Sequence, residues 1–217
     1  MMTRMTATDG HELDCWMEPA TGDRQGGLVM LQEIFGVTDQ LKGVAKRYAG
    51  LGYDVAIPAL FDRQERGTVI PFDEAMRGRE TMMALDLKNT MMDVEAAVQA
   101  LAVKGGVAVM GFCWGGGLAL RSAQLLDVRG GIAFYGTRLA DYLDRPLKAP
   151  MLCHFGTEDD HTPAELVDQV TAYLPDIEVH MYEAGHAFAN DARPAYVPEA
   201  AALAHQRSEV FLAKMLA

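Results

Sequence analysis

The segment VAVMGFCWGGGLAL, residues 107–120, carries a cysteine in a setting suited to covalent chemistry. Residues 111–115 have the G-x-S-x-G spacing of a hydrolase nucleophile elbow, with Cys113 in the position of the serine. Such an elbow exposes its nucleophile between a strand and a helix. The positive end of that helix favours the thiolate, which is the form that attacks a carbonyl carbon. A small buried cysteine in a tight turn is the alternative, and the strand–glycine–helix context favours the nucleophile.

Two later loops carry groups that could activate this thiol. GTEDDHTP (residues 156–163) and EAGHAF (residues 183–188) each follow an apolar stretch. With Cys113 they give the chain order cysteine, aspartate, His186, which is the order of α/β-hydrolase triads. A neutral His186 would take the thiol proton and later activate water, while a carboxylate would hold its tautomer and stabilise the imidazolium. Asp159 and Asp160 both fit that carboxylate. A lone histidine or a loop aspartate is usually structural, so the signal lies in their joint occurrence.

The elements that must position these loops alternate along the chain. An N-terminal hairpin over residues 5–19 turns at Asp9-Gly10. Strands are expected at residues 26–32, 53–58, 107–111, 131–135, 149–156 and 177–182. Helices are expected at residues 39–51, 73–102 with a break near 86–89, 114–126, 162–174 and 198–216. This alternation predicts an α/β fold, with a mostly parallel sheet and helices on both faces.

The size and position of these elements bound the arrangement of the site. We expect residues 1–217 to form one domain, because α/β folds commonly occupy this length. The reactive loops then lie at the carboxyl ends of the strands, where ligands bind in such sheets. The segment FDRQERGTVIPFD, residues 61–73, is short enough to be a further active-site loop.

Charge and composition exclude several classes of function. Half of the residues are hydrophobic, and 19 basic against 30 acidic residues give a net charge of −11. Such a surface disfavours nucleic-acid and membrane partners. No apolar run reaches the roughly 18 residues of a membrane span, and the N-terminus has no signal-peptide core. Cys15, Cys113 and Cys153 are widely spaced, which predicts neither a disulfide framework nor a zinc site and indicates the cytoplasm. We expect Cys15 and Cys153 to be core residues.

Four motifs together resemble the dienelactone hydrolases, also called carboxymethylenebutenolidases. They are QEIFGV (residues 32–37), GFCWGG (residues 111–116), GTEDDHTP and EAGHAF, and the likeness extends over nearly the whole chain. The resemblance implies an α/β-hydrolase fold. The family's triad aspartate lies four positions before the loop proline, which selects Asp159. Asp160 would then face solvent or cap the next helix, and His161 would be structural.

The resemblance also assigns roles near the first motif. Glu33 would lie beside the resting thiol and keep it protonated until substrate displaces it, which would protect the cysteine from oxidation. A strand-end carboxylate that merely reaches water is the alternative. The backbone N–H groups of Ile34 and Trp114 would form the oxyanion hole that binds the charge developing on the carbonyl oxygen.

The sequence departs from the family where an anionic substrate would bind. Dienelactone hydrolases hold the substrate carboxylate with arginines, and the one four residues after the triad histidine is Asn190 here, with Arg193 nearby but displaced. For a second family arginine, Arg79 and Arg77 are both candidates, and Arg79 is favoured. Both could equally be solvated helix charges. Tyr135 matches a family tyrosine near the pocket, although a strand-end aromatic could simply pack there.

The residues therefore predict hydrolysis of a small lactone or carboxylic ester through a thioester acyl-enzyme. No metal or organic cofactor is required, and the oligomeric state, monomer or dimer, stays open. One alternative is a broader carboxylesterase or thioesterase that acts on neutral esters with the same machinery. Another is a non-catalytic binder or a thiol-redox sensor that keeps the fold and a reactive cysteine. A stoichiometric acyl burst with an activated ester would separate the enzymes from the sensor.

Overall fold

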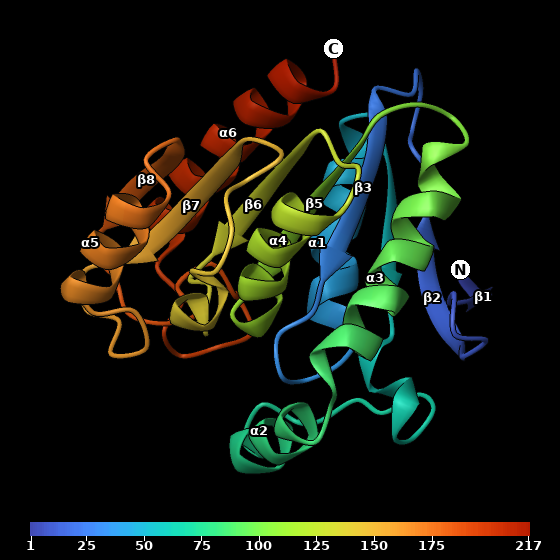
Figure 1. The fold of residues 1–217 in the computed structure, drawn as a ribbon, viewed down its shortest axis with the longest axis horizontal. Coiled ribbons are helices and arrows are strands. Elements are labelled where there is room, and N and C mark those ends of the chain that lie inside the picture. Colours follow the sequence, from blue (N-terminus) through green and yellow to red (C-terminus); the bar gives the residue numbers. More distant parts are fainter. The chain divides into compact units, whose positions relative to one another are not determined.

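The computed structural model describes all 217 residues, and they divide into two compact units, Met1–Val107 and Ala108–Ala217. Each unit contains a four-stranded stretch of sheet with helices packed against it (Figure 1). The single domain expected over residues 1–217 stays a prediction.

The first unit is built on strands β1 (Met2–Thr6), β2 (Glu12–Glu18), β3 (Gly26–Leu31) and β4 (Tyr53–Pro58), in the order β1-β2-β4-β3. The predicted hairpin is confirmed: β1 and β2 pair antiparallel, and Gly10 takes the positive φ of 84° that its turn requires. Strand β2 pairs antiparallel with β4, whereas β3 and β4 run parallel. Every residue of β3 is buried, as expected for a strand that is covered on both faces.

Three helices and one short 3₁₀ helix complete this unit. They are α1 (Asp39–Gly50), η1 (Leu60–Arg63), α2 (Ala75–Met83) and α3 (Leu87–Ala102). The predicted break lies between α2 and α3, where Asp86 caps α3 by accepting the Asn89 N–H at 2.9 Å. Helix α1 packs on β2 and β4, and α3 packs on β3 and β4. In Figure 1, α3 lies in front of these strands and α1 behind them, so both faces are covered.

The second unit continues the pattern with four parallel strands. They are β5 (Val107–Phe112, whose first residue ends the first unit), β6 (Gly130–Phe134), β7 (Met151–Gly156) and β8 (Ile177–Tyr182), paired in that order. The helices of this unit are α4 (Trp114–Leu125), η2 (Leu139–Tyr142), α5 (Ala164–Tyr173) and, after the last strand, α6 (Pro198–Met215). Because parallel strands share one direction, the loops after β5, β6, β7 and β8 leave from the same edge of this sheet.

Helices cover both faces of this second sheet as well. Neighbouring residues of a strand point to opposite faces. A side chain added at Gly130 would meet Phe211 of α6 at 2.8 Å, whereas one at the next position, Gly131, would approach Ala119 and Ala123 of α4. Helices α4 and α6 therefore lie on opposite faces, and the α/β class predicted from the sequence is confirmed.

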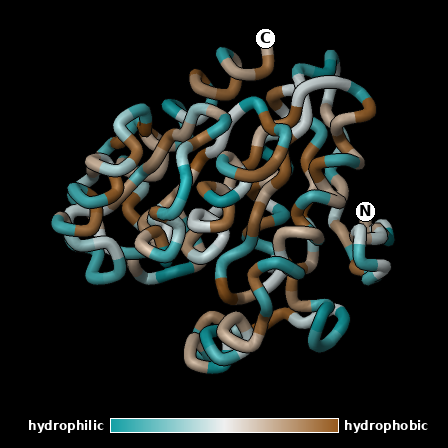
Figure 2. Tube along the Cα trace, viewed as in Figure 1, coloured by the Kyte–Doolittle hydropathy of each residue, from teal (hydrophilic) through white to brown (hydrophobic).

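The hydropathy of the chain follows this layering. In Figure 2, brown segments run along the strands and teal gathers in the connecting loops. Phe134, Phe155 and Leu28 are among the strand residues with no exposed surface. No helix combines the length with the apolar composition that crossing a membrane would need.

Candidate active site

Cys113 is held in a strained backbone conformation at the turn between β5 and α4. Its φ of 53° and ψ of −118° lie in a region that residues with a side chain rarely adopt. The surrounding backbone fixes this geometry: the Cys113 N–H donates to the Phe134 carbonyl at 3.0 Å, and the Cys113 carbonyl accepts the N–H groups of Gly116 at 2.9 Å and Thr137 at 3.0 Å. The turn thus presents the thiol at the carboxyl edge of the sheet.

The first glycine of the G-x-C-x-G spacing has a steric reason. A Cβ atom at Gly111 would lie 1.8 Å from the carbonyl oxygen of Gly115, which is a backbone atom with little room to move. The chain can reverse this sharply into α4 only where residue 111 has no side chain.

Asp159 lies in the loop after β7, and its carboxylate is fully buried and fully engaged. Its Oδ1 accepts the His161 N–H at 2.8 Å, and its Oδ2 accepts the Nδ1–H of His186 at 2.8 Å. Burial opposes ionisation, but the hydrogen bond and charge of His186, together with the His161 N–H, hold the pKa of Asp159 below its usual value. Its neighbour Asp160 is exposed.

His186, in the loop after β8, joins this carboxylate to the thiol. Its ring hydrogen-bonds both Asp159 and Cys113. Burial favours the neutral ring, yet these two hydrogen bonds and the negative charges of both partners raise the pKa of His186 to about 10. The sequence led us to expect a neutral imidazole that takes up the thiol proton. With this pKa, the imidazole already carries its second proton at neutral pH.

Two further rings hold the imidazole in place. The ring of Tyr135 meets His186 edge-on at 5.2 Å, and that of His161 lies 4.4 Å away. Tyr135 is fully buried, has a positive φ of 39°, and donates its N–H to the His154 carbonyl at 2.7 Å. The contact between His161 and His186 was missed in the sequence, although its position two residues after Asp159 is a signal that could have suggested it.

The other two cysteines are inert by comparison. Cys15 and Cys153 have no exposed surface, whereas Cys113 is partly exposed. Burial raises the pKa of the Cys15 thiol to about 12 and raises that of Cys153 as well. Both are core residues, as predicted.

The predicted residues around a substrate have mixed surroundings. Trp114 is buried at the first position of α4. The N–H groups in the first turn of a helix have no carbonyl acceptor within the helix and can donate to groups outside it. Asn190 is 2 % exposed, and its Oδ1 accepts the N–H of Ala192 at 3.1 Å. The Asn190 N–H donates to Ala187, a residue with a φ of 65°. The Asn190 oxygen is therefore engaged in folding its own loop.

Four predicted site residues belong to the first unit. Glu33 is 8 % exposed and lies two residues after the end of β3, and Ile34 is partly exposed beside it. On α2, Arg77 pairs with Glu74 of the same helix at 2.9 Å, which offsets its charge, while Arg79 is exposed and has no such partner.

Comparisons with known proteins bear on this arrangement. The family model for the dienelactone hydrolase family matches residues 15–216. A carboxymethylenebutenolidase of Pseudomonas putida is 33 % identical over 220 residues, covering 95 % of this chain and 93 % of that protein. A carboxymethylenebutenolidase of Pseudomonas sp. strain P51 is 35 % identical over 210 residues, covering 91 % and 87 %.

Solved structures share the fold. A Klebsiella pneumoniae protein assigned to the dienelactone hydrolases superposes with a TM-score of 0.84 at 23 % identity, covering 99 % of each chain. The dienelactone hydrolase-like promiscuous phosphotriesterase P91, from metagenomic libraries, superposes with a TM-score of 0.77 at 20 % identity, covering 99 % of this chain and 98 % of that one. At these identities the likeness establishes the α/β-hydrolase fold alone.

Proposed function

The chain belongs to the dienelactone hydrolase family, and from that premise we propose that Cys113, His186 and Asp159 are the catalytic triad with which it hydrolyses its substrates. The chain is a hydrolase of small lactones or carboxylic esters. The observation that carries the triad is the unbroken hydrogen-bonded path from the Cys113 thiol through His186 to the Asp159 carboxylate.

Acylation begins from the thiolate and the imidazolium. The sulfur of Cys113 attacks the carbonyl carbon, and a C–S bond forms as the negative charge moves to the carbonyl oxygen. Collapse of this intermediate breaks the C–O bond of the ester or lactone, and His186 gives its proton to the leaving oxygen. In a lactone the leaving oxygen stays on the acyl chain. Asp159 stabilises the imidazolium before the transfer and keeps the tautomer correct after it.

Deacylation uses the neutral imidazole that acylation leaves behind. His186 removes a proton from water as the water oxygen attacks the thioester carbon. The C–S bond then breaks, the product leaves as a carboxylic acid that ionises in water, and Cys113 and His186 return to the thiolate–imidazolium pair. Water can reach the thioester because the side chains of Cys113 and His186 are both partly exposed.

Two further roles come from the family likeness. The N–H groups of Ile34 and Trp114 bind the oxyanion during both steps. Before substrate binds, Glu33 keeps the Cys113 thiol protonated. When substrate displaces Glu33, its carboxylate takes the thiol proton, which gives the thiolate from which acylation begins, and the proton returns to Cys113 after the product leaves. The support for Glu33 is its near-complete burial, because a buried carboxylate is costly unless another group engages it.

The triad can be tested by alkylation and substitution. Iodoacetamide should abolish hydrolysis of an activated ester in step with modification of Cys113, and Cys113→Ala should lose several orders of magnitude in kcat/KM, as expected for a triad that acts as a unit. Cys15→Ala is the matched control, because it also removes a thiol, and it should keep nearly full activity per folded molecule. A Cys113→Ala protein that retains most of its turnover would exclude the triad.

A neutral ester is a second candidate substrate class. It is favoured by the charges of the predicted anion-binding residues, since Asn190 is neutral where the family has an arginine and Arg77 is paired with Glu74. Of the predicted substrate-binding residues, Arg79 then remains to attract a carboxylate. A screen of lactones and esters, each as free acid and as methyl ester, separates the two classes.

We also propose a reducing compartment, the cytoplasm, as the place of action. All three cysteines are free thiols, and a reactive thiolate survives longest where glutathione and thioredoxin keep thiols reduced. The partner is a small-molecule substrate.

A further inference from the structure

The loop of residues 32–37 is held by its own first side chain. Gln32 has no exposed surface, and its amide bonds in two directions. Its Nε2 donates to the Glu33 carbonyl at 3.4 Å, and its Oε1 accepts the Leu60 N–H at 3.2 Å. The Glu33 carbonyl belongs to the same planar peptide group as the Ile34 N–H. A contact that fixes the direction of one therefore fixes the direction of the other.

The next two carbonyls of the loop are also restrained. Helix α2 packs directly on Ile34: a Cβ atom at Gly78 would lie 2.3 Å from the Ile34 carbonyl oxygen. The Phe35 carbonyl accepts the Ile70 N–H at 2.9 Å, and the Phe35 ring meets that of Phe72 edge-on at 4.9 Å. The carbonyls of residues 33 and 35 thus accept hydrogen bonds from Gln32 and Ile70, and the Ile34 carbonyl between them lies against α2 at Gly78.

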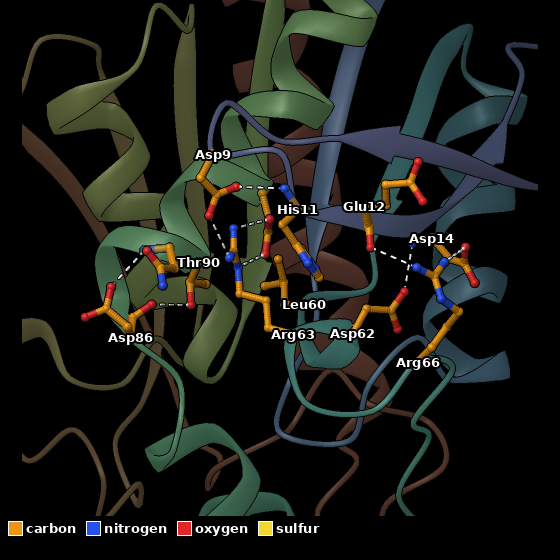
Figure 3. Close-up of polar contacts among 12 residues, drawn as sticks. Asp9, His11, Glu12, Asp14, Leu60, Asp62, Arg63, Arg66, Asp86 and Thr90 are labelled. Atoms are coloured by element: carbon orange, nitrogen blue, oxygen red, sulfur yellow. Dashed lines mark hydrogen bonds and ion pairs between the residues drawn. The ribbon is translucent and has the colours of Figure 1, made fainter.

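The segment that supplies these contacts is itself anchored by ion pairs (Figure 3). Arg63 directs its guanidinium at the buried Asp93, with two contacts of 2.7 Å, and at Asp9 at 2.8 Å. Arg66 pairs with Asp14 at 2.7 Å. Forked arginine–carboxylate pairs of this kind restrict orientation as well as distance. Residues 60–70 therefore give the loop a rigid support.

We propose that Gln32 and Gly78 are positioning residues that aim the Ile34 N–H as an oxyanion donor. This rests on the proposed function, which gives that N–H its role. Gln32 hydrogen-bonds the peptide group before the Ile34 Cα atom, and the backbone of α2 at Gly78 packs against the one after it. Neither side chain has to touch the substrate. Gly78 acts by lacking a Cβ atom, which lets α2 lie against the loop backbone.

Substitution of Gly78 by alanine should push the Ile34 carbonyl and α2 apart. Moving the Ile34 oxygen from 2.3 Å to beyond the 3.0 Å that real contacts keep requires a shift of at least 0.7 Å. Misplacements of about 1 Å can cost about a hundredfold in rate. We expect Gly78→Ala to lower kcat by about ten- to a hundredfold with KM within about twofold. Gly43→Ala is the matched control, because Gly43 also lies within a helix and a Cβ atom there meets nothing within 4 Å.

A pair of substrates separates oxyanion positioning from a general structural role. An oxygen ester and its thionoester, with C=S in place of C=O, differ in the atom that receives the charge, and sulfur accepts hydrogen bonds weakly. Wild-type protein should strongly favour the oxygen ester. In Gly78→Ala and Gln32→Met the ratio of the two kcat/KM values should fall by about tenfold, because the aimed donor serves the oxygen alone.

These measurements separate the positioning role of Gln32 and Gly78 from the role of the triad. Equal losses on both substrates, with the ratio unchanged in the folded variants, would overturn the positioning role while the triad stands. Should Gln32→Met fail to fold because the buried Leu60 N–H is left without an acceptor, Gly78→Ala decides alone. An active Cys113→Ala protein is a separate result, and it would remove the proposed function rather than the positioning of the loop.

Discussion

Two histidines of the second unit, His186 and His154, show how differently the same side chain is set. His186 lies in a loop at the carboxyl edge of the sheet, and hydrogen bonds to Asp159 and Cys113 raise its pKa to about 10 despite burial. His154 lies inside β7, where its Nδ1 meets the Tyr182 hydroxyl at 2.8 Å and its Nε2 meets the Ser208 hydroxyl at 3.0 Å. Burial, with the nearby His180, His205 and Arg207, holds the pKa of His154 well below its ordinary value.

The difference between them is the charge of their partners. Both rings are largely removed from water and both have two hydrogen-bonding neighbours, but only His186 has partners that can be negative. A buried imidazole with neutral partners stays neutral and serves packing, whereas one with a carboxylate can store a proton for chemistry. Burial alone is thus a poor guide to which histidine acts.

Replacing each ring tests this contrast with the largest expected effect. His186→Ala should lower kcat/KM by about 10⁴ or more, because the members of a triad act together. His154→Leu should keep activity within about twofold and lower the free energy of unfolding by about 1–2 kcal/mol, the value of its hydrogen bonds. Tyr182 retains Arg207 and Ser208 retains the Ala204 carbonyl, so neither hydroxyl is left unpaired. Activity assays and urea unfolding measure both, and comparable activity losses would remove the distinction.

The same contrast predicts how the stability of the fold changes as the pH falls. The pKa of His154 is lower in the folded chain than its ordinary value of 6.5, so the unfolded chain binds this proton more readily. Its contribution to stability is complete above pH 6.5 and is lost as the pH falls below it. Wild-type protein should therefore lose stability more steeply than His154→Leu between about pH 6.5 and 5. Parallel melting curves across this range would contradict the account.

Asp159→Asn tests the source of the His186 proton. Without the carboxylate, the pKa of His186 should fall toward its ordinary value, since a hydrogen bond and a charge that raise it are gone. The alkaline limb of kcat/KM, expected near pH 10 in the wild type, should move to lower pH, and kcat should drop by about 10²–10⁴. An unchanged alkaline limb would mean that another group sets it.

Glu33→Gln probes the resting state of the thiol. If Glu33 keeps Cys113 protonated, its loss should speed iodoacetamide modification a few-fold at neutral pH and flatten the pH dependence of that reaction. Turnover should fall, because substrate would no longer displace a carboxylate from the thiol. Identical alkylation profiles for the two proteins would leave Glu33 as a structural strand-end residue.

Substrate charge should give the smallest effect. With the neutral Asn190 in the place of a family arginine, we expect at most a modest preference for a free-acid dienelactone over its methyl ester. Arg79→Ala should lower kcat/KM for the acid by about tenfold, the value of one charge-assisted hydrogen bond, and leave the ester unchanged. Asn190→Arg should raise kcat/KM for the acid and leave that for the ester nearly unchanged. A preference for the ester that neither substitution changes would favour the hypothesis that neutral esters are the substrates.

Sequence patterns predicted the parts of this molecule that depend on residue type and chain order. The strands, the helices, a helix break near residues 86–89 and the core cysteines all follow from periodicity, capping and composition, although the break itself lies slightly earlier, between Met83 and Leu87. Gly111 was recognisable because its spacing reflects a local clash. The features that the sequence did not predict depend on contacts between distant segments, such as Gln32 with Leu60 and Gly78 with Ile34. The raised pKa of His186 could not be predicted for the same reason, since it depends on its contacts with Asp159 and Cys113, which sequence spacing does not give.

The central claim is that the chain works through a covalent thioester on Cys113. Mixing the protein with an excess of an activated ester, quenching in acid within milliseconds and analysing peptides by mass spectrometry tests this directly. The account predicts one acyl group per chain, located on the peptide that contains Cys113, formed faster than steady-state turnover and absent from Cys113→Ala. Full turnover with no acylated Cys113 peptide, or acylation on another residue, would contradict it.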